Sequence, residues 1–83
     1  MYDVDLRQEA FEFLLALPED EQHRLLLAAR AIGADPFAEP DFEGHTDEGP
    51  LRGDVVGVFA ILYHVDHAVR RIRVVDITYA DRI

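Results

Sequence analysis

Two histidines in the C-terminal third of the chain, His64 and His67, are spaced as H-x-x-H. Such a pair could supply two metal ligands, and His64 could serve as a general base because an imidazole titrates near neutrality. The flanking residues predict that His64 ends a strand and that His67 lies in a turn, and no third ligand is defined beside them. We therefore expect no metal and no cofactor, and the favoured interpretation is an exposed histidine on a strand.

Arginine supplies every basic side chain of this protein. The chain has eight Arg, no Lys and 17 acidic residues, which give a net charge of −9. Residues 1–50 contain thirteen acidic residues and three Arg, whereas residues 51–83 contain four Asp and five Arg. The overall charge disfavours nonspecific nucleic-acid binding and favours a basic partner. The Arg-rich part is either a second functional surface or a charged, protected sheet edge.

Length and composition narrow the class of protein further. A chain of 83 residues predicts one domain, residues 1–83, with a core small enough that a partner or a homodimer could add stability. The absence of Cys excludes disulfides and a thiolate nucleophile. No apolar run of about 18 residues and no signal peptide is present, so we expect a cytoplasmic protein. Phosphate-cradling glycine loops, nucleophile elbows and dinucleotide fingerprints are also absent.

The N-terminal half predicts a strand followed by two helices. Tyr2–Leu6 alternates apolar and polar residues, which is the period of a half-buried strand. Arg7–Leu17 changes to helical spacing, and a second helix begins after Pro18 and ends near Gly33, which could form a left-handed C-terminal cap. We expect the apolar helical faces to consist of Ala10, Phe11, Phe13, Leu14, Leu15 and Leu17 in the first helix, and of Leu25, Leu26, Ala29 and Ile32 in the second.

The C-terminal half predicts a long loop followed by strands. Residues 33–50 are rich in Pro, Gly and acidic residues and predict an acidic loop that could contain a short extended piece near Phe42. Strands are predicted at Asp54–Val56, Val58–Val65 and Arg70–Ile77, the last two forming a hairpin, and Thr78–Ile83 is predicted to be a tail. The fold class is therefore α+β, in the order β-α-α-β-β(-β), with a two-helix hairpin packed on a small twisted sheet that is mainly antiparallel. The first strand is expected to pair with a C-terminal strand.

This element order resembles that of the RelE/ParE superfamily, the toxins of type II toxin–antitoxin modules. The likeness covers nearly the whole chain, and four short segments carry it. These segments are Leu17-Pro18, Leu51-Arg52-Gly53-Asp54, Leu62-Tyr63-His64-Val65-Asp66 and Arg71-Ile72-Arg73-Val74-Val75-Asp76-Ile77. The resemblance implies a RelE/ParE-like fold and a toxin that a cognate antitoxin protein holds inactive.

The resemblance also implies a reaction. RelE-like members cleave mRNA in the ribosomal A site, using basic residues on the sheet and an Arg, His, Lys or Tyr near the last strand. The implied activity is a metal-independent endoribonuclease that acts on mRNA and the ribosome. Arginine can stabilise the charge of a phosphorane, and Tyr can donate a proton or stack on a base. The positions that match are Arg52, Arg73, Tyr79 and Arg82, although each could also be an ordinary strand or tail residue.

A second class of function remains open beside the nuclease. ParE-like members inhibit DNA gyrase without a nuclease site, and a decayed toxin would only bind a partner. The net charge of −9, the absence of Lys and Ala60, at a position where members often carry an Arg, all favour this alternative. The acidic residues of segment 33–50 could then pair with a basic antitoxin segment, or could form a solvated loop.

Overall fold

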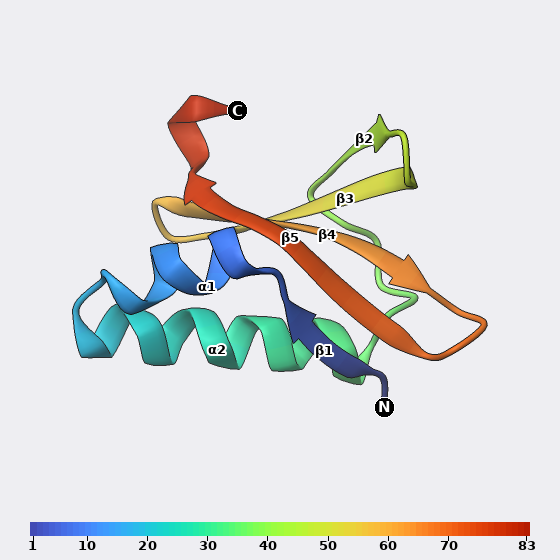
Figure 1. The fold of residues 1–83 in the computed structure, drawn as a ribbon, viewed down its shortest axis with the longest axis horizontal. Helices are drawn as coiled ribbons and strands as arrows, with labels where there is room; N and C mark the ends of the chain where they lie inside the picture. Colours follow the sequence, from blue (N-terminus) through green and yellow to red (C-terminus); the bar gives the residue numbers. More distant parts are fainter.

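The computed structural model describes residues 1–83 and has two layers, a five-stranded sheet and two helices that cover one of its faces (Figure 1). The strand order is β1-β5-β4-β3-β2, with β1 parallel to β5 and all other pairs antiparallel. The predicted α+β class and the pairing of the first strand with a C-terminal strand are confirmed. The elements are β1 (Asp3–Leu6), α1 (Gln8–Leu15), α2 (Glu19–Ala34), β2 (Phe42–Thr46), β3 (Gly49–Val56), β4 (Phe59–Asp66), β5 (Arg71–Tyr79) and a final 3-10 turn (Ala80–Arg82).

The core lies between the helices and the sheet face that they cover, here called the inner face. Successive strand residues point to opposite faces, so every second residue of β4 reaches this core, and β5 follows the same alternation except at one bulge. Burying an aliphatic side chain of this size stabilises the fold by roughly 1.5–3 kcal/mol. The strands contribute Phe59, Ile61, Tyr63, Ile72, Val74 and Ile77, and the helices contribute Ala10, Leu14, Leu25 and Ile32.

A bulge in β5 decides which of its residues face the helices. Leu62 pairs with Asp76 whereas Tyr63 pairs with Val74, so Val75 is the extra residue in β5. The bulge allows both Val74 and Ile77 to be buried although they are three residues apart. It also places Arg73 on the uncovered outer face and Tyr79 on the inner face.

The buried apolar face of each helix is narrower than the one predicted from the spacing of its apolar residues. Phe11, Leu15 and Leu26 are 47%, 56% and 46% exposed, so their predicted core positions are wrong. The physical reason is that each helix packs on only one side, against the sheet, which leaves the flanks of its apolar stripe in solvent. Neither helix has the length and the apolar composition required to cross a membrane.

Gly33 does not cap a helix, contrary to the prediction. It lies inside α2, which continues to Ala34, and Asp35 is the C-terminal cap. The Tyr2 amide donates a hydrogen bond to the Gly33 carbonyl at 2.8 Å, and a Cβ at Gly33 would lie 2.7 Å from the backbone carbonyl oxygen of Tyr2. Glycine is required here because the chain entering β1 crosses α2 at very short distance.

The predicted 18-residue acidic loop is wrong except for its extended piece near Phe42, which lies in β2. Residues 42–46 form β2, a two-residue turn of Asp47 and Glu48 follows, and β3 begins at Gly49, whose φ of 117° suits glycine. The pairing of β2 with β3 could not be inferred from the sequence, because β2 contains a Gly and alternates poorly. Likewise, β3 is longer than the predicted Asp54–Val56, and β5 extends to Tyr79, two residues into the predicted tail.

Candidate functional site

The outer face of the sheet carries a row of charged and polar side chains on three adjacent strands. Arg73 lies between Ile72 and Val74, which are both fully buried on the inner face, so its side chain points outward. Asp5 of β1 and His64 of β4 are the residues that pair with Arg73 on either side. The three side chains therefore share one level of the outer face.

Arg7 follows β1 directly and is the N-terminal cap residue of α1. Its amide donates a hydrogen bond to the carbonyl of Val74 at 2.9 Å, which continues the pairing of β1 with β5. Because Leu6 packs against the core, the alternation of the strand turns Arg7 to the outer face. Arg7 therefore lies one step along the sheet from the row that contains Arg73.

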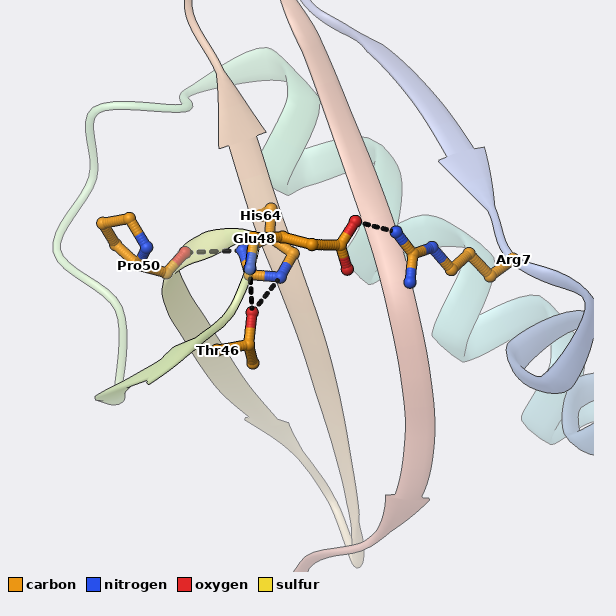
Figure 2. A network of polar contacts seen from close by, with 5 residues as sticks. All are labelled: Arg7, Thr46, Glu48, Pro50 and His64. Carbon is orange, nitrogen blue, oxygen red and sulfur yellow. Dashed lines mark hydrogen bonds and ion pairs between the residues drawn. The ribbon is translucent and has the colours of Figure 1, made fainter.

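His64 organises a short chain of hydrogen bonds across the outer face (Figure 2). Its Nδ1 lies 2.7 Å from the carbonyl oxygen of Pro50, which can only accept, so Nδ1 carries the proton. In the neutral ring Nε2 is then the acceptor, and the Thr46 hydroxyl donates to it at 3.1 Å. The Thr46 oxygen in turn accepts the amide hydrogen of Glu48 at 3.2 Å. These bonds hold the turn that contains Glu48 over β4.

The side chain of Glu48 extends from this turn to Arg7, with which it forms a hydrogen-bonded ion pair (Figure 2). The hydrogen bond from Arg7, together with the positive charges of Arg7 and Arg73, holds the pKa of the Glu48 carboxyl below its ordinary value, although partial desolvation opposes this. The same hydrogen bond raises the pKa of Arg7. The Glu48 carboxylate is thus an anion placed among the cationic side chains of the outer face.

The remaining arginines of this face differ in their neighbours. The Nε of Arg71 lies 3.3 Å from a carboxylate oxygen of Asp5, which partly neutralises it. Arg73 forms no hydrogen bond or ion pair within the chain. Its guanidinium is therefore the one on this face that is free to bind an external anion.

The four residues selected from the sequence do not all come together. Arg52 pairs in register with Tyr63, a core residue, so it lies on the inner side of β3, where it donates to the carbonyl of Pro36 at 3.0 Å. Arg73 lies on the opposite face of the sheet. Arg52 therefore holds the loop before β2 in place through this hydrogen bond. The sheet separates Arg52 from Arg73.

Tyr79 and Arg82 lie together at the C-terminal end of β5. The ring of Tyr79 packs against Phe13 and Phe59, with centroids 5.6 and 5.3 Å apart, and the guanidinium carbon of Arg82 lies 5.1 Å from its centroid. This contact is a cation–π interaction. Tyr79 and Arg82 are six to nine positions along the chain from Arg73, so the two groups of residues form separate parts of the surface.

Sequence reasoning missed Arg7 and Thr46, and it considered Glu48 only as one of the acidic residues of segment 33–50. The alternation Asp3, Asp5, Arg7 was the one available signal, because it continues the outward positions of β1 past its last residue. The roles of Thr46 and Glu48 depend on how the β2–β3 turn folds over the sheet. No local pattern encodes that placement.

Histidines and carboxylates are not grouped in the way that a metal site requires. No group of three His, Cys, Asp or Glu side chains is close enough to hold a metal ion. His64 and His67 point to different partners, since His67 Nδ1 lies 2.9 Å from the Tyr2 hydroxyl and Phe37 stacks on the His67 ring.

A cavity of about 460 Å³ lies on the inner side, between α2 and β3. Tyr63 and Asp54 line it, and the Tyr63 hydroxyl donates to the Asp54 carboxylate at 3.3 Å. Burial, together with the negative charge of Asp54, raises the pKa of Tyr63 to about 12. This phenol therefore remains protonated at neutral pH and acts as a structural donor to Asp54.

Comparison with known proteins relates the fold to solved structures. No protein-family model matches the chain, and no curated protein has a significantly similar sequence. The archaeal RelE–RelB complex from Pyrococcus horikoshii aligns with a TM-score of 0.80 at 16% identity, over 99% of this chain and 98% of that chain. The isolated Escherichia coli RelE toxin aligns with a TM-score of 0.80 at 16% identity, over 100% of this chain and 88% of that chain.

A third similar structure is the toxin–antitoxin complex RelBE2 from Mycobacterium tuberculosis, with a TM-score of 0.77 at 16% identity over 94% of this chain and 96% of that chain. At such low identity the likeness establishes the fold. The chain therefore has the RelE fold along nearly its whole length, as the resemblance of its short motifs predicts.

Proposed function

We propose that this protein is the toxin of a RelE-type toxin–antitoxin pair and that it cleaves mRNA on the ribosome. The observation that carries the proposal is the likeness to RelE structures over 99% of the chain. Two of the similar structures are complexes of a RelE-type protein with its partner, which supports a cognate antitoxin as the partner of this chain.

In this proposal Arg73 is the residue that contacts the reacting phosphate. RNA cleavage by the 2′-hydroxyl builds negative charge on the phosphorane oxygens, and a guanidinium can hold two of them at once. Arg73 has no competing partner within the chain. His64 lies next to it on β4, and its Nε2 would accept the 2′-hydroxyl proton once the Thr46 hydroxyl turns away. The 2′-oxygen would then form a cyclic phosphate as the P–O5′ bond breaks, and the leaving 5′-oxygen would take a proton from water.

Tyr79 and Arg82 take a different role in this proposal. Tyr79 lies six positions along β5 from Arg73, which corresponds to roughly 20 Å of strand. They would therefore contact a nucleotide further along the RNA, by stacking and by charge. Arg52, which bonds to Pro36, would support the loop before β2 and would not touch RNA.

The test is growth of a bacterial culture after induced expression, in parallel with cell-free translation probed for cuts in the mRNA. We expect the wild type to arrest growth and to cut mRNA. Arg73→Gln should reduce cleavage by about a hundredfold or more, the usual effect of removing one donor to a developing oxyanion. Arg30→Gln makes the same charge change on an exposed position of α2 and should leave cleavage unchanged.

Two other results would change the proposal. Growth arrest without mRNA cuts would reject the nuclease and point to another target, such as the DNA gyrase that ParE-like members inhibit. Normal growth with abundant, folded wild-type protein would reject a toxin altogether.

The second candidate function is a non-enzymatic binding module on the same fold. It is favoured by the use of Arg52 and Tyr79 in internal contacts and by the net charge of −9, which repels RNA. A neighbouring gene for a small protein with a basic segment, and a stable complex of the two proteins that lacks RNA cleavage after dissociation, would support this alternative.

A further inference from the structure

One contact joins the two edges of the sheet across its outer face. Glu48 lies in the turn after β2, which is the strand at one edge, and Arg7 follows β1, which is the strand at the other edge. The ion pair between them therefore spans the sheet above β4 and β5 (Figure 2). The carboxylate of Glu48 crosses the region of the outer face where Arg73 and His64 lie.

The backbone of the turn and the side chain of Glu48 are held separately. The bonds of His64 to Pro50 and Thr46, and of Thr46 to the Glu48 amide, position the turn. The Glu48 side chain makes no hydrogen bond other than that to Arg7. Rotation of this one side chain would therefore uncover Arg7 without disturbing the hairpin.

A carboxylate on an arginine resembles a phosphate on an arginine. Both ligands present two anionic oxygens to the planar guanidinium, and both form charge-assisted hydrogen bonds with it. Side chains of Arg7 and Glu48 are 39% and 46% exposed, so water and solutes reach the pair. A pair this exposed changes an equilibrium constant by at most about fivefold, which an incoming phosphate can overcome.

We propose that Arg7, with Arg73 and His64 beside it, forms a binding site for a phosphate group of the RNA backbone, and that Glu48 is an internal anion which this phosphate displaces. The inference rests on the proposed function for the source of the phosphate. Glu48 thereby weakens RNA binding by the free protein, and RNA gains access to the outer face when its side chain leaves Arg7.

The test compares two substitutions in the same turn. Glu48→Gln removes the anion and keeps the size of the side chain, whereas Asp47→Asn makes the same charge change on an exposed neighbour that forms no ion pair. The probes are a short single-stranded RNA, followed by fluorescence anisotropy at low salt, and inorganic pyrophosphate, followed by the NMR shift of the residue 48 amide. Glu48→Gln should bind both probes up to about fivefold more tightly than the wild type.

Two controls make this result specific. Asp47→Asn should bind both probes nearly as the wild type does, and adding Arg7→Gln to Glu48→Gln should remove the gain. Equal gains in Asp47→Asn and Glu48→Gln would reveal a general charge effect and overturn the inference. The absence of any gain in Glu48→Gln, for either probe, would also overturn it.

The two probes separate this inference from the proposed function. Tighter pyrophosphate binding by Glu48→Gln, without RNA binding by any variant, would support Glu48 as the occupant of an anion site and count against RNA as its ligand. Glu48→Gln could instead cleave RNA as fast as the wild type and bind both probes with the wild-type affinity. That result would support the nuclease and overturn the role of Glu48.

Discussion

At the scale of single residues, Tyr63 shows how burial and a neighbouring charge combine. Its side chain is only 2% exposed, yet its hydroxyl reaches the carboxylate of Asp54. Both effects disfavour the phenolate, so the pKa rises to about 12 from an ordinary value of about 10. The folded state therefore holds this proton more tightly than the unfolded state does. Its contribution to stability is complete below pH 10 and is lost as the pH rises through 12.

Tyr63→Phe tests this linkage. Near neutral pH the substitution should lower the free energy of unfolding by about 1 kcal/mol, because one hydrogen bond to Asp54 is lost. Between about pH 10 and pH 12 the variant should lose less stability than the wild type, because it has no phenol to titrate there. Urea denaturation at both pH values measures the difference.

The control for this experiment is Tyr79→Phe, which removes a hydroxyl that bonds to no group within the chain and keeps the ring packed on Phe13 and Phe59. It should retain the alkaline loss of stability. If Tyr63→Phe loses as much stability at alkaline pH as the wild type does, groups other than Tyr63 cause that loss.

Two arginines of β5 also differ at the residue scale although they are only two positions apart. Arg71 pairs with Asp3 in register and lies against Asp5, and its covered Nε has no hydrogen-bond partner. Arg73 faces His64 on one side and lacks an ion pair. Equal side chains on the same strand therefore differ in their availability to an anion, and Arg73 is the more available of the two.

At the scale of elements, the crossing of β1 over the end of α2 is a close contact that involves the backbone of both elements. A Cβ at Gly33 would lie 2.7 Å from the carbonyl oxygen of Tyr2 and 2.9 Å from Cγ2 of Val4. The first of these is a backbone atom that is fixed by the hydrogen bond between Tyr2 and Gly33. Any side chain at position 33 must therefore push β1 away from α2.

Gly33→Ala should lower the free energy of unfolding by about 1–3 kcal/mol, the usual cost of overpacking a close contact. Gly44→Ala is the matched control, because Gly44 lies in β2 and a Cβ there would meet nothing within 4 Å. Its effect should stay within about 0.5 kcal/mol. Urea denaturation of both variants measures these changes, and equal effects would show that the crossing tolerates a methyl group.

At the scale of the whole molecule, the net charge of −9 on 83 residues is the dominant long-range feature. Like charges repel one another more strongly in the compact state than in the expanded unfolded chain. The same field attracts a basic partner and opposes RNA. In the proposed function, arginines such as Arg73 would have to overcome this repulsion close to the phosphate.

Moderate salt should therefore stabilise this protein. Raising the ionic strength from roughly 0.01 M to 0.15 M shortens the Debye length from about 30 Å to about 8 Å, which screens the repulsion. We expect the free energy of unfolding to increase, as measured by urea denaturation at the two NaCl concentrations. The double variant Glu43→Gln and Asp47→Asn carries two fewer negative charges and should gain less. Destabilisation by salt would show that attractive pairs, such as Arg7 with Glu48, outweigh the net charge.

The sequence by itself determined the fold class, the two helices and the long C-terminal strands. These elements have a clear hydrophobic period, and a period of two or of 3.6 residues is a local property of the chain. Local signals also identified short motifs resembling those of RelE/ParE toxins, whose fold the chain has. The same signals failed for β2, where pairing with β3 outweighs weak strand propensity, and for Gly33, where a contact with Tyr2 explains the glycine.

The tertiary structure alone decided which residues share a surface. The bulge at Val75 sends Arg73 to the outer face and Tyr79 to the inner face, and strand register places Arg52 beside the core residue Tyr63. The fold of the β2–β3 turn over the sheet brings Glu48 to Arg7, 41 positions away in the chain. A one-residue shift of register exchanges the two faces of a strand, so the spacing of residues in the sequence could not determine these neighbours.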